Sequence, residues 1–114
     1  MRQLILALAI CAVALFAQDA PRPAGAAPKN LKVLKAADIR ASMGMATSGL
    51  GVMCTECHVQ GDNSSDDKPS KLTARMMFQM TQEINAKFPD GKMHVTCYSC
   101  HRGTKEPLMA APKA

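Results

Sequence analysis

The feature that most constrains this chain is a five-residue pattern, C-x-x-C-H, that occurs twice. The first copy is CTECH at Cys54–His58, and the second is CYSCH at Cys97–His101. The chain has 114 residues, enough for one domain, and its five cysteines are these four and Cys11. Each copy therefore presents two sulfurs and one imidazole within a single turn of chain. Any fold of this sequence must place that chemical unit at two positions in a small domain.

C-x-x-C-H is the attachment pattern of c-type haem. Two thiols add to the two vinyl groups at one edge of the porphyrin, and a two-residue gap in a helical turn separates the sulfurs suitably. The histidine that follows gives one imidazole nitrogen to the iron. The sequence therefore predicts two haem c groups per chain. The expected attachment residues are Cys54, Cys57, Cys97 and Cys100, and the expected proximal iron ligands are His58 and His101.

Two other uses of paired cysteines explain less of the pattern. A zinc ion bound by four cysteines would suit the two C-x-x-C pairs, and exported cysteines commonly form disulfides or thiol-exchange pairs. Both alternatives leave the two adjacent histidines without a role. Nucleic acid is not an expected partner: the formal net charge is +5, but the chain has no basic run interleaved with aromatic residues.

The N-terminal stretch predicts export. Residues 1–17 combine a positive start with an uncharged apolar run, which is typical of a signal peptide and short for a membrane span. Residues 18–29 are rich in proline and alanine and predict a flexible spacer. A lipoprotein anchor at Cys11 is disfavoured because bulky Ile10 stands where such signals need a small residue. The expected location is the periplasm or the cell exterior.

The remaining pattern predicts a mainly α fold. Apolar residues recur at helical spacing between 30 and 50, and again from about Pro69 to Lys87. Each segment runs through a glycine or proline turn into a CxxCH motif. The expected domain, 30–107, is thus two helix–turn–CxxCH units packed around two covalent haems, with 108–114 as a C-terminal tail. The chain has no tryptophan, one tyrosine and three phenylalanines, so haem is expected to fill its core.

Methionine is the expected source of the second axial ligands. Near the first motif, Met43 lies on the apolar stripe of its helix, whereas Met45 points to nearly the opposite side. Near the second motif, Met77 and Met80 share one apolar stripe, so periodicity cannot separate them, and Met76 lies on a more polar side. Most methionines in helices are core filler, but nine in so short a chain favour a ligand role.

Glycines in and after the first predicted helix raise a related expectation. Gly44, Gly49 and Gly51 lower helix stability, but they allow the backbone to approach a flat ring closely. The helix is expected to end at Gly49 or Gly51, directly before the first CxxCH motif.

Three stretches of the chain, ARMMFQMTQEIN, VTCYSCHRGTKEP and LGVMCTECH, resemble the cytochrome c subunit of photosynthetic reaction centres. They resemble its small dihaem relatives in non-photosynthetic bacteria more closely, over about residues 30–107. The full subunit carries four haems in two pairs, so this chain resembles half of it. The resemblance implies axial methionines from the helix before each motif, namely Met43 and Met77. The one non-motif histidine, His94, does not match the family's histidine ligand.

These features together predict an electron carrier. Histidine and methionine fill both axial positions, which leaves outer-sphere electron transfer and no substrate chemistry. The expected partners are a redox protein donor and acceptor, which could be membrane-bound. A different class of function is a dihaem protein with one open iron that acts as a peroxidase or binds small gases. A third is a protomer of an extracellular haem array, in which copies of the chain associate.

Overall fold

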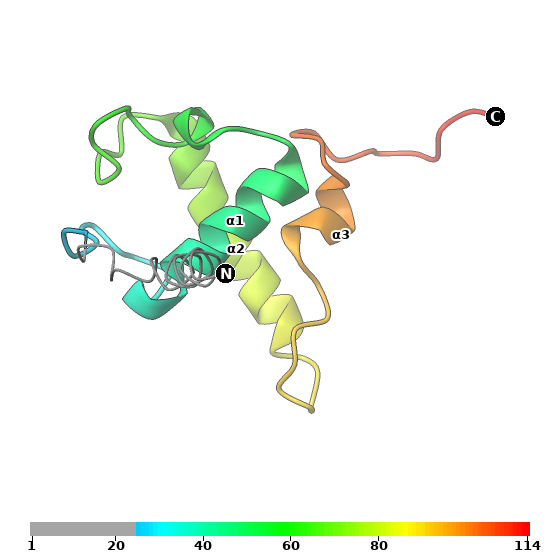
Figure 1. Cartoon of the computed structure of the whole chain (residues 1–114). Helices are drawn as coiled ribbons and strands as arrows, with labels where there is room; N and C mark the ends of the chain where they lie inside the picture. Colours follow the sequence, from blue (N-terminus) through cyan, green and yellow to red (C-terminus); the bar gives the residue numbers. More distant parts are fainter. Residues whose placement is uncertain (1–24) are drawn as a thin grey trace, which may run out of the picture.

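The computed structural model describes residues 25–114, and the described part is built from helices (Figure 1). It contains no strand, only a single bridge between Val59 and Asp62. The expected signal peptide at 1–17, Cys11 and residues 18–24 of the expected spacer lie outside the described residues. In chain order the elements are η1 (Ala36–Asp38), α1 (Ile39–Leu50), η2 (Cys54–Glu56), α2 (Pro69–Asn85) and α3 (Cys97–His101).

The first helix begins later than the apolar periodicity suggested. Residues 30–35 are not helical, and one 3₁₀ turn precedes α1. Asn30 has a left-handed backbone, with φ of 58°, and its side-chain amide donates to Asp66 Oδ1 at 2.9 Å. This tertiary contact ties the start of the segment to the loop before Pro69. The predicted end is confirmed: Gly51 has φ of 65°, and its N–H caps the Thr47 carbonyl.

The second long helix has the predicted start. Pro69 occupies its first turn, where the missing N–H costs nothing, and the preceding Lys68 is extended. The helix ends at Asn85, two residues before the predicted end. The turn that follows contains Gly91 at φ of 66°, and the Lys92 N–H donates to Asp90 Oδ1 at 3.0 Å. Proline, aspartate and glycine thus form the tight turn that their chemistry favours.

The short helix α3 packs against the C-terminal end of α1, and α2 crosses behind α1 (Figure 1). The α1–α3 contact depends on glycine. A Cβ atom at Gly49 would lie 2.7 Å from Cys97 Cβ and 2.8 Å from Tyr98 N, and one at Gly51 would collide with the Gly103 carbonyl. Gly44 has open space beside it. Gly49 and Gly51 therefore allow a close approach between two chain segments, and their expected approach to a flat ring stays a prediction.

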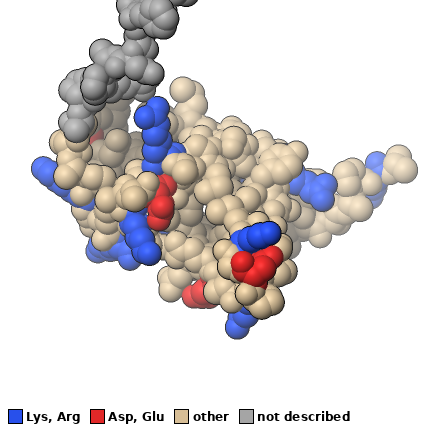
Figure 2. All heavy atoms as spheres, turned by 60° about the horizontal axis from the view of Figure 1, so that its bottom comes forward, with Lys and Arg blue, Asp and Glu red and all other residues tan. Residues whose placement is uncertain are grey.

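The described residues enclose no buried hydrophobic core. No apolar side chain is fully buried, and several large ones are well exposed, including Met53, Met76, Met93 and Tyr98. On the face shown in Figure 2, Lys and Arg side chains lie at several separate places beside broad uncharged areas. None of the described helices has the length and hydropathy needed to cross a membrane. A polypeptide with so little buried apolar surface is marginal without a further apolar component.

Candidate haem-binding sites

The first CxxCH motif forms one tight helical turn after α1. The Cys57 N–H donates to the Cys54 carbonyl at 3.2 Å, and the His58 N–H donates to the same carbonyl at 2.9 Å. Cys54 is exposed and Cys57 is partly buried. Lys68 anchors this turn, because its Nζ donates to the Thr55 carbonyl. The turn thus holds both sulfurs and the histidine on one short segment.

The ring of His58 is held by the loop that follows it. Its Nδ1 lies 3.1 Å from the carbonyl oxygen of Asn63. A carbonyl can only accept a hydrogen bond, so Nδ1 carries the proton and Nε2 keeps its lone pair. Haem and metal histidines are commonly oriented in this way by a backbone carbonyl. The arrangement fits a proximal iron ligand.

The second CxxCH motif is the helix α3 itself. Thr96 and Ser99 form a capping box at its start, in which the Thr96 N–H donates to Ser99 Oγ at 3.0 Å. The helix ends at His101 and is capped by Arg102, a non-glycine residue with φ of 52°, whose N–H donates to the Tyr98 carbonyl at 3.0 Å. The motif is therefore closed at both ends by local hydrogen bonds.

His101 repeats the arrangement of the first histidine with different residues. Its Nδ1 lies 3.1 Å from the Thr104 carbonyl oxygen, and Thr104 Oγ1 donates to the His101 carbonyl at 2.8 Å. The Nε2 of His101 is again the nitrogen left for a metal. Both motifs thus hold their histidine in the same tautomer, and both pass the same test of fit for a c-type haem.

The four motif cysteines are chemically available. None is disulfide-bonded, and within residues 25–114 no three His, Cys, Asp or Glu side chains converge as they would around zinc. Burial raises the pKa of the Cys57 and Cys97 thiols. Thiol-exchange pairs need the opposite shift, toward a thiolate at neutral pH. The arrangement of these side chains thus gives no support to the zinc alternative, and the raised pKa values of the two thiols give none to the thiol-exchange alternative.

The candidate axial methionines lie on α1 and α2. Met43 and Met77 are both partly buried, whereas Met76 is 58% exposed and Met80 is 45% exposed. A hollow of about 240 Å³ lies between α1, α2 and the segment before α3. Met45 and Cys97 line this hollow, and Met43 and Met77 do not. Met43 and Met45 therefore differ in their surroundings, as their spacing on the helix predicts.

The family described as "Photosynthetic reaction centre cytochrome C subunit" matches residues 9–110. The chain belongs to this family. The reaction centre cytochrome c subunit of Thermochromatium tepidum is 42% identical over 62 residues, which are 50% of this chain and 15% of that protein. Cytochrome c-554 of Chloroflexus aurantiacus is 34% identical over 88 residues, which are 69% of this chain and 21% of that protein. No solved structure matches.

Membership in a cytochrome c family implies covalently bound haem c. The chain spans only 15% to 21% of the length of the curated relatives it matches. The resemblance that the sequence motifs indicated is thus confirmed, but the matched share of those relatives is smaller than the half that we expected. Which chain residues hold each haem stays a prediction at both motifs.

His94, the histidine outside the two motifs, lies in a surface cluster. Its Nε2 is 2.9 Å from both carboxylate oxygens of Asp90, and its ring stacks on Phe88 with centroids 4.0 Å apart. The hydrogen bond from His94 lowers the pKa of the Asp90 carboxyl. These contacts give His94 a structural role at the turn after α2.

Sequence reasoning missed two polar groups that position the sites. Asn85, at the end of α2, donates to the Val95 carbonyl at 2.8 Å and accepts from the N–H groups of His94 and Val95. It thereby fixes the segment that leads into α3. Glu56, inside the first motif, forms an ion pair with Lys105, which follows the second motif in the sequence. Lys105 Nζ lies 2.6 Å from Glu56 Oε1. No known sequence pattern requires an asparagine at position 85 or a glutamate at position 56, so no sequence signal could have identified these two residues.

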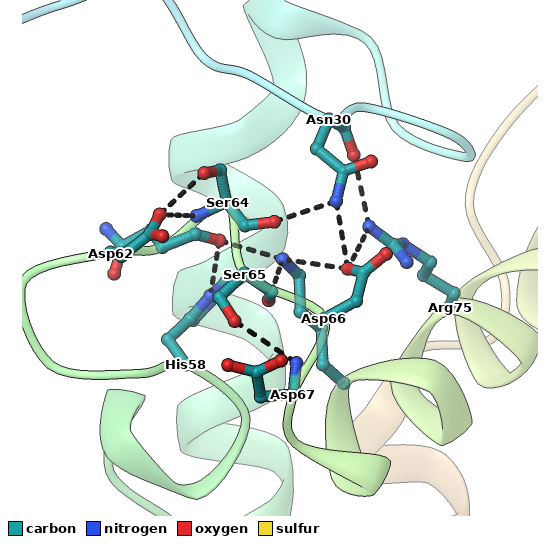
Figure 3. A network of polar contacts seen from close by, with 10 residues as sticks. Asn30, His58, Asp62, Ser64, Ser65, Asp66, Asp67 and Arg75 are labelled. Atoms are coloured by element: carbon teal, nitrogen blue, oxygen red, sulfur yellow. Dashed lines mark hydrogen bonds and ion pairs between the residues drawn. The ribbon is translucent and has the colours of Figure 1, made fainter.

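The third missed group is a polar network behind the first motif (Figure 3). It joins the loop after His58 to α2 and to Asn30 through Asp66 and Arg75, whose Nη2 lies 2.9 Å from Asp66 Oδ1. The hydrogen bonds that Arg75 and Asn30 donate to Asp66 lower the pKa of its carboxyl well below its ordinary range. This network gives the first site a polar backing that the sequence pattern did not indicate.

Proposed function

We propose that this chain is an exported dihaem c-type cytochrome that carries out outer-sphere electron transfer. The observation that carries the proposal is the repetition of one arrangement. Each CxxCH motif forms a helical turn, and in each the histidine Nδ1 lies 3.1 Å from a backbone carbonyl. Family membership supports the cytochrome chemistry, and the duplication of the motif supports two haems per chain.

Each motif residue has a defined role in this proposal. Thioether bonds form at Cys54, Cys57, Cys97 and Cys100. His58 and His101 supply the proximal nitrogens, and Met43 and Met77 supply the distal sulfurs. Bound in this way, the haem supplies a reversible one-electron iron couple. The chain orients the histidines through the Asn63 and Thr104 carbonyls, and Met43 and Met77 would keep other ligands away from the iron.

The lack of a buried hydrophobic core supports the same proposal. Two porphyrins, each tied by two thioethers, supply the large apolar surfaces that the described side chains do not. The exposed methionines of α2 and the hollow beside Cys97 are apolar surfaces of the kind that a haem would cover. The chain thus folds around its cofactors.

The partners and location follow from this role. We propose that the electron donor and acceptor are redox proteins, soluble or membrane-bound. Residues 1–17 direct the chain to the periplasm or the cell exterior, where c-type haem is attached. With both axial positions filled, the chain is a carrier and not an enzyme. The match to reaction centre subunits does not identify the partners of this chain, because the chain spans only a small part of those proteins.

The test is to produce the chain in a host that attaches c-type haem and to weigh the purified protein. A mass increase of two haems supports the proposal, and replacement of Cys97 and Cys100 by alanine is expected to remove one haem. A mass increase of one haem or none contradicts it. Added carbon monoxide is expected to leave the reduced spectrum unchanged. A spectral change would favour the alternative with an open iron, a peroxidase or gas binder.

A further inference from the structure

Lys71 is the one charged side chain that is buried among the described residues, with 8% of its surface exposed. It lies in the first turn of α2, under the loop that follows the first motif. Its Nζ is 2.9 Å from the Asn63 carbonyl, 2.6 Å from the Ser65 carbonyl and 3.3 Å from Asp66 Oδ1. An ammonium group has three protons, and three acceptors surround this one. The side chain is therefore held at a fixed place.

The Asn63 carbonyl that binds Lys71 is the one that orients His58. Its oxygen lies 3.1 Å from His58 Nδ1 and 2.9 Å from Lys71 Nζ. One carbonyl thus accepts from an imidazole and from a buried cation at the same time. Figure 3 shows His58 beside the loop that carries Asp66, with Arg75 on the neighbouring helix. The buried charge is thus linked to the imidazole of the first site through one shared carbonyl.

Two cations of this network contact the same carboxylate, because Lys71 and Arg75 both lie against Asp66. Hydrogen bonds from Ser64 lower the pKa of a second carboxylate, Asp62, and the nearby charge of Lys71 lowers it further. Arg75 is also largely buried, with 18% of its side chain exposed. Buried charges are screened much less than surface charges, so the buried ammonium of Lys71 acts on groups nearby.

The second site lacks this backing. His101 Nδ1 lies against the Thr104 carbonyl, and no cation among residues 25–114 donates to that oxygen. The nearest lysine in the chain, Lys105, pairs instead with Glu56 at 2.6 Å, and 54% of its side chain is exposed. The two histidines are thus held alike, but only the first shares its carbonyl with a buried cation.

We propose that Lys71 is a positioning residue that makes the first site the one with the higher reduction potential. The inference rests on the proposed function. A fixed positive charge behind His58 opposes the additional charge of ferric iron. A carbonyl that also binds Lys71 attracts the Nδ1 proton less, which leaves the imidazole a weaker electron donor. Both effects favour the reduced state at the first site, so a single electron entering the chain resides there.

The test is a redox titration of the dihaem protein and its variants. Wild-type protein is expected to show two one-electron steps, and NMR contacts between each haem and its own thioether cysteines assign each step to a motif. The upper step should belong to Cys54–His58. Lys71→Met is expected to lower the reduction equilibrium constant of this step about tenfold, which is about 59 mV for one electron. Lys71→Arg should retain most of it.

A variant of opposite sign separates the charge from mere structural support. Asp66→Asn removes the carboxylate that offsets Lys71 and Arg75, so the upper step is expected to rise. Loosening of the site would lower it instead. Asp66 is only partly buried, with 36% of its side chain exposed, so this variant is expected to fold even if Lys71→Met does not. Lys92→Met, at an exposed lysine, is the matched control and should move neither step.

The outcomes are distinct. If the upper step belongs to Cys97–His101, or if Asp66→Asn lowers the upper step, the inference is wrong. The same holds if Lys71→Met shifts both steps equally or neither. A wild-type protein without two covalent haems would instead contradict the proposed function. The haem count is therefore measured first, and the potentials are compared only among proteins that carry two haems.

Discussion

The two CxxCH motifs present the same atoms but are held by different forces. The first is backed by a polar network that reaches α2 through Lys71 and Asp66. The second is an end-capped helix pressed onto α1 at Gly49. One site therefore depends on buried charge and hydrogen bonds, and the other on close backbone packing. The difference teaches that two copies of one short motif can be held in place by quite different surroundings.

The largest expected effect is the removal of both haems. Because the described chain buries no apolar side chain fully, the haem-free protein should lose most of its helical signal and show no cooperative transition. Circular dichroism with heating measures both. If the haem-free chain melted like the dihaem protein, the chain alone would hold both motifs in place. The prediction that haem completes the fold would then be wrong.

The next effect is specific to the second site. Gly49→Ala would place a Cβ atom 2.7 Å from Cys97 Cβ and 2.8 Å from the backbone nitrogen of Tyr98. We expect a loss of about 1–3 kcal/mol, the usual cost of overpacking, and reduced haem attachment at the second motif. Denaturant unfolding and the mass of the product measure these. Gly44→Ala is the control: with open space at that position, it should stabilise the helix by about 1 kcal/mol.

A smaller effect is expected where α2 meets the second motif. Asn85→Ala removes three hydrogen bonds to the backbone of His94 and Val95. At about 0.5–1.5 kcal/mol each, the expected loss is roughly 2 kcal/mol, and hydrogen exchange should accelerate at 94–96. Exchange in the first motif should stay unchanged. Gln79→Ala, at an exposed position of the same helix, is the control; equal acceleration in both variants would refute this role.

The smallest effect concerns the ion pair that joins the two motifs. Hydrogen bonds from Lys105 and Ser70 lower the pKa of Glu56 below its ordinary value of 4.5. A carboxyl with a lowered folded-state pKa stabilises the protein above its unfolded pKa, and this contribution is lost as the pH falls through the folded one. Glu56→Gln should therefore flatten the loss of stability below about pH 4.5. Melting curves between pH 7 and pH 3 measure it; a variant with an unchanged acid slope would show that the pair is inert.

Sequence patterns predict where haem would attach but not what surrounds each motif. The cysteines and histidines are predicted from the spacing that haem attachment needs, and Pro69 and Gly51 could be predicted as helix limits because their backbones allow little else. The role of Gly49 could not, because its partner, Cys97, is remote in sequence. The Asn63 carbonyl could not either, since any residue offers a backbone carbonyl. Met77 and Met80 share one stripe, so physical periodicity left the ligand open and only the family resemblance favoured Met77.

The central claim is that two haems are each bound by one histidine and one methionine. The weak far-red absorption band of oxidised protein reports a thioether sulfur on ferric haem, and its intensity can be scaled to the number of haems. The account predicts the intensity of two methionine-bound haems, reduced by half in Met43→Ala and in Met77→Ala. An intensity for one haem or none in the wild-type protein would contradict it, as would a band that both variants leave unchanged.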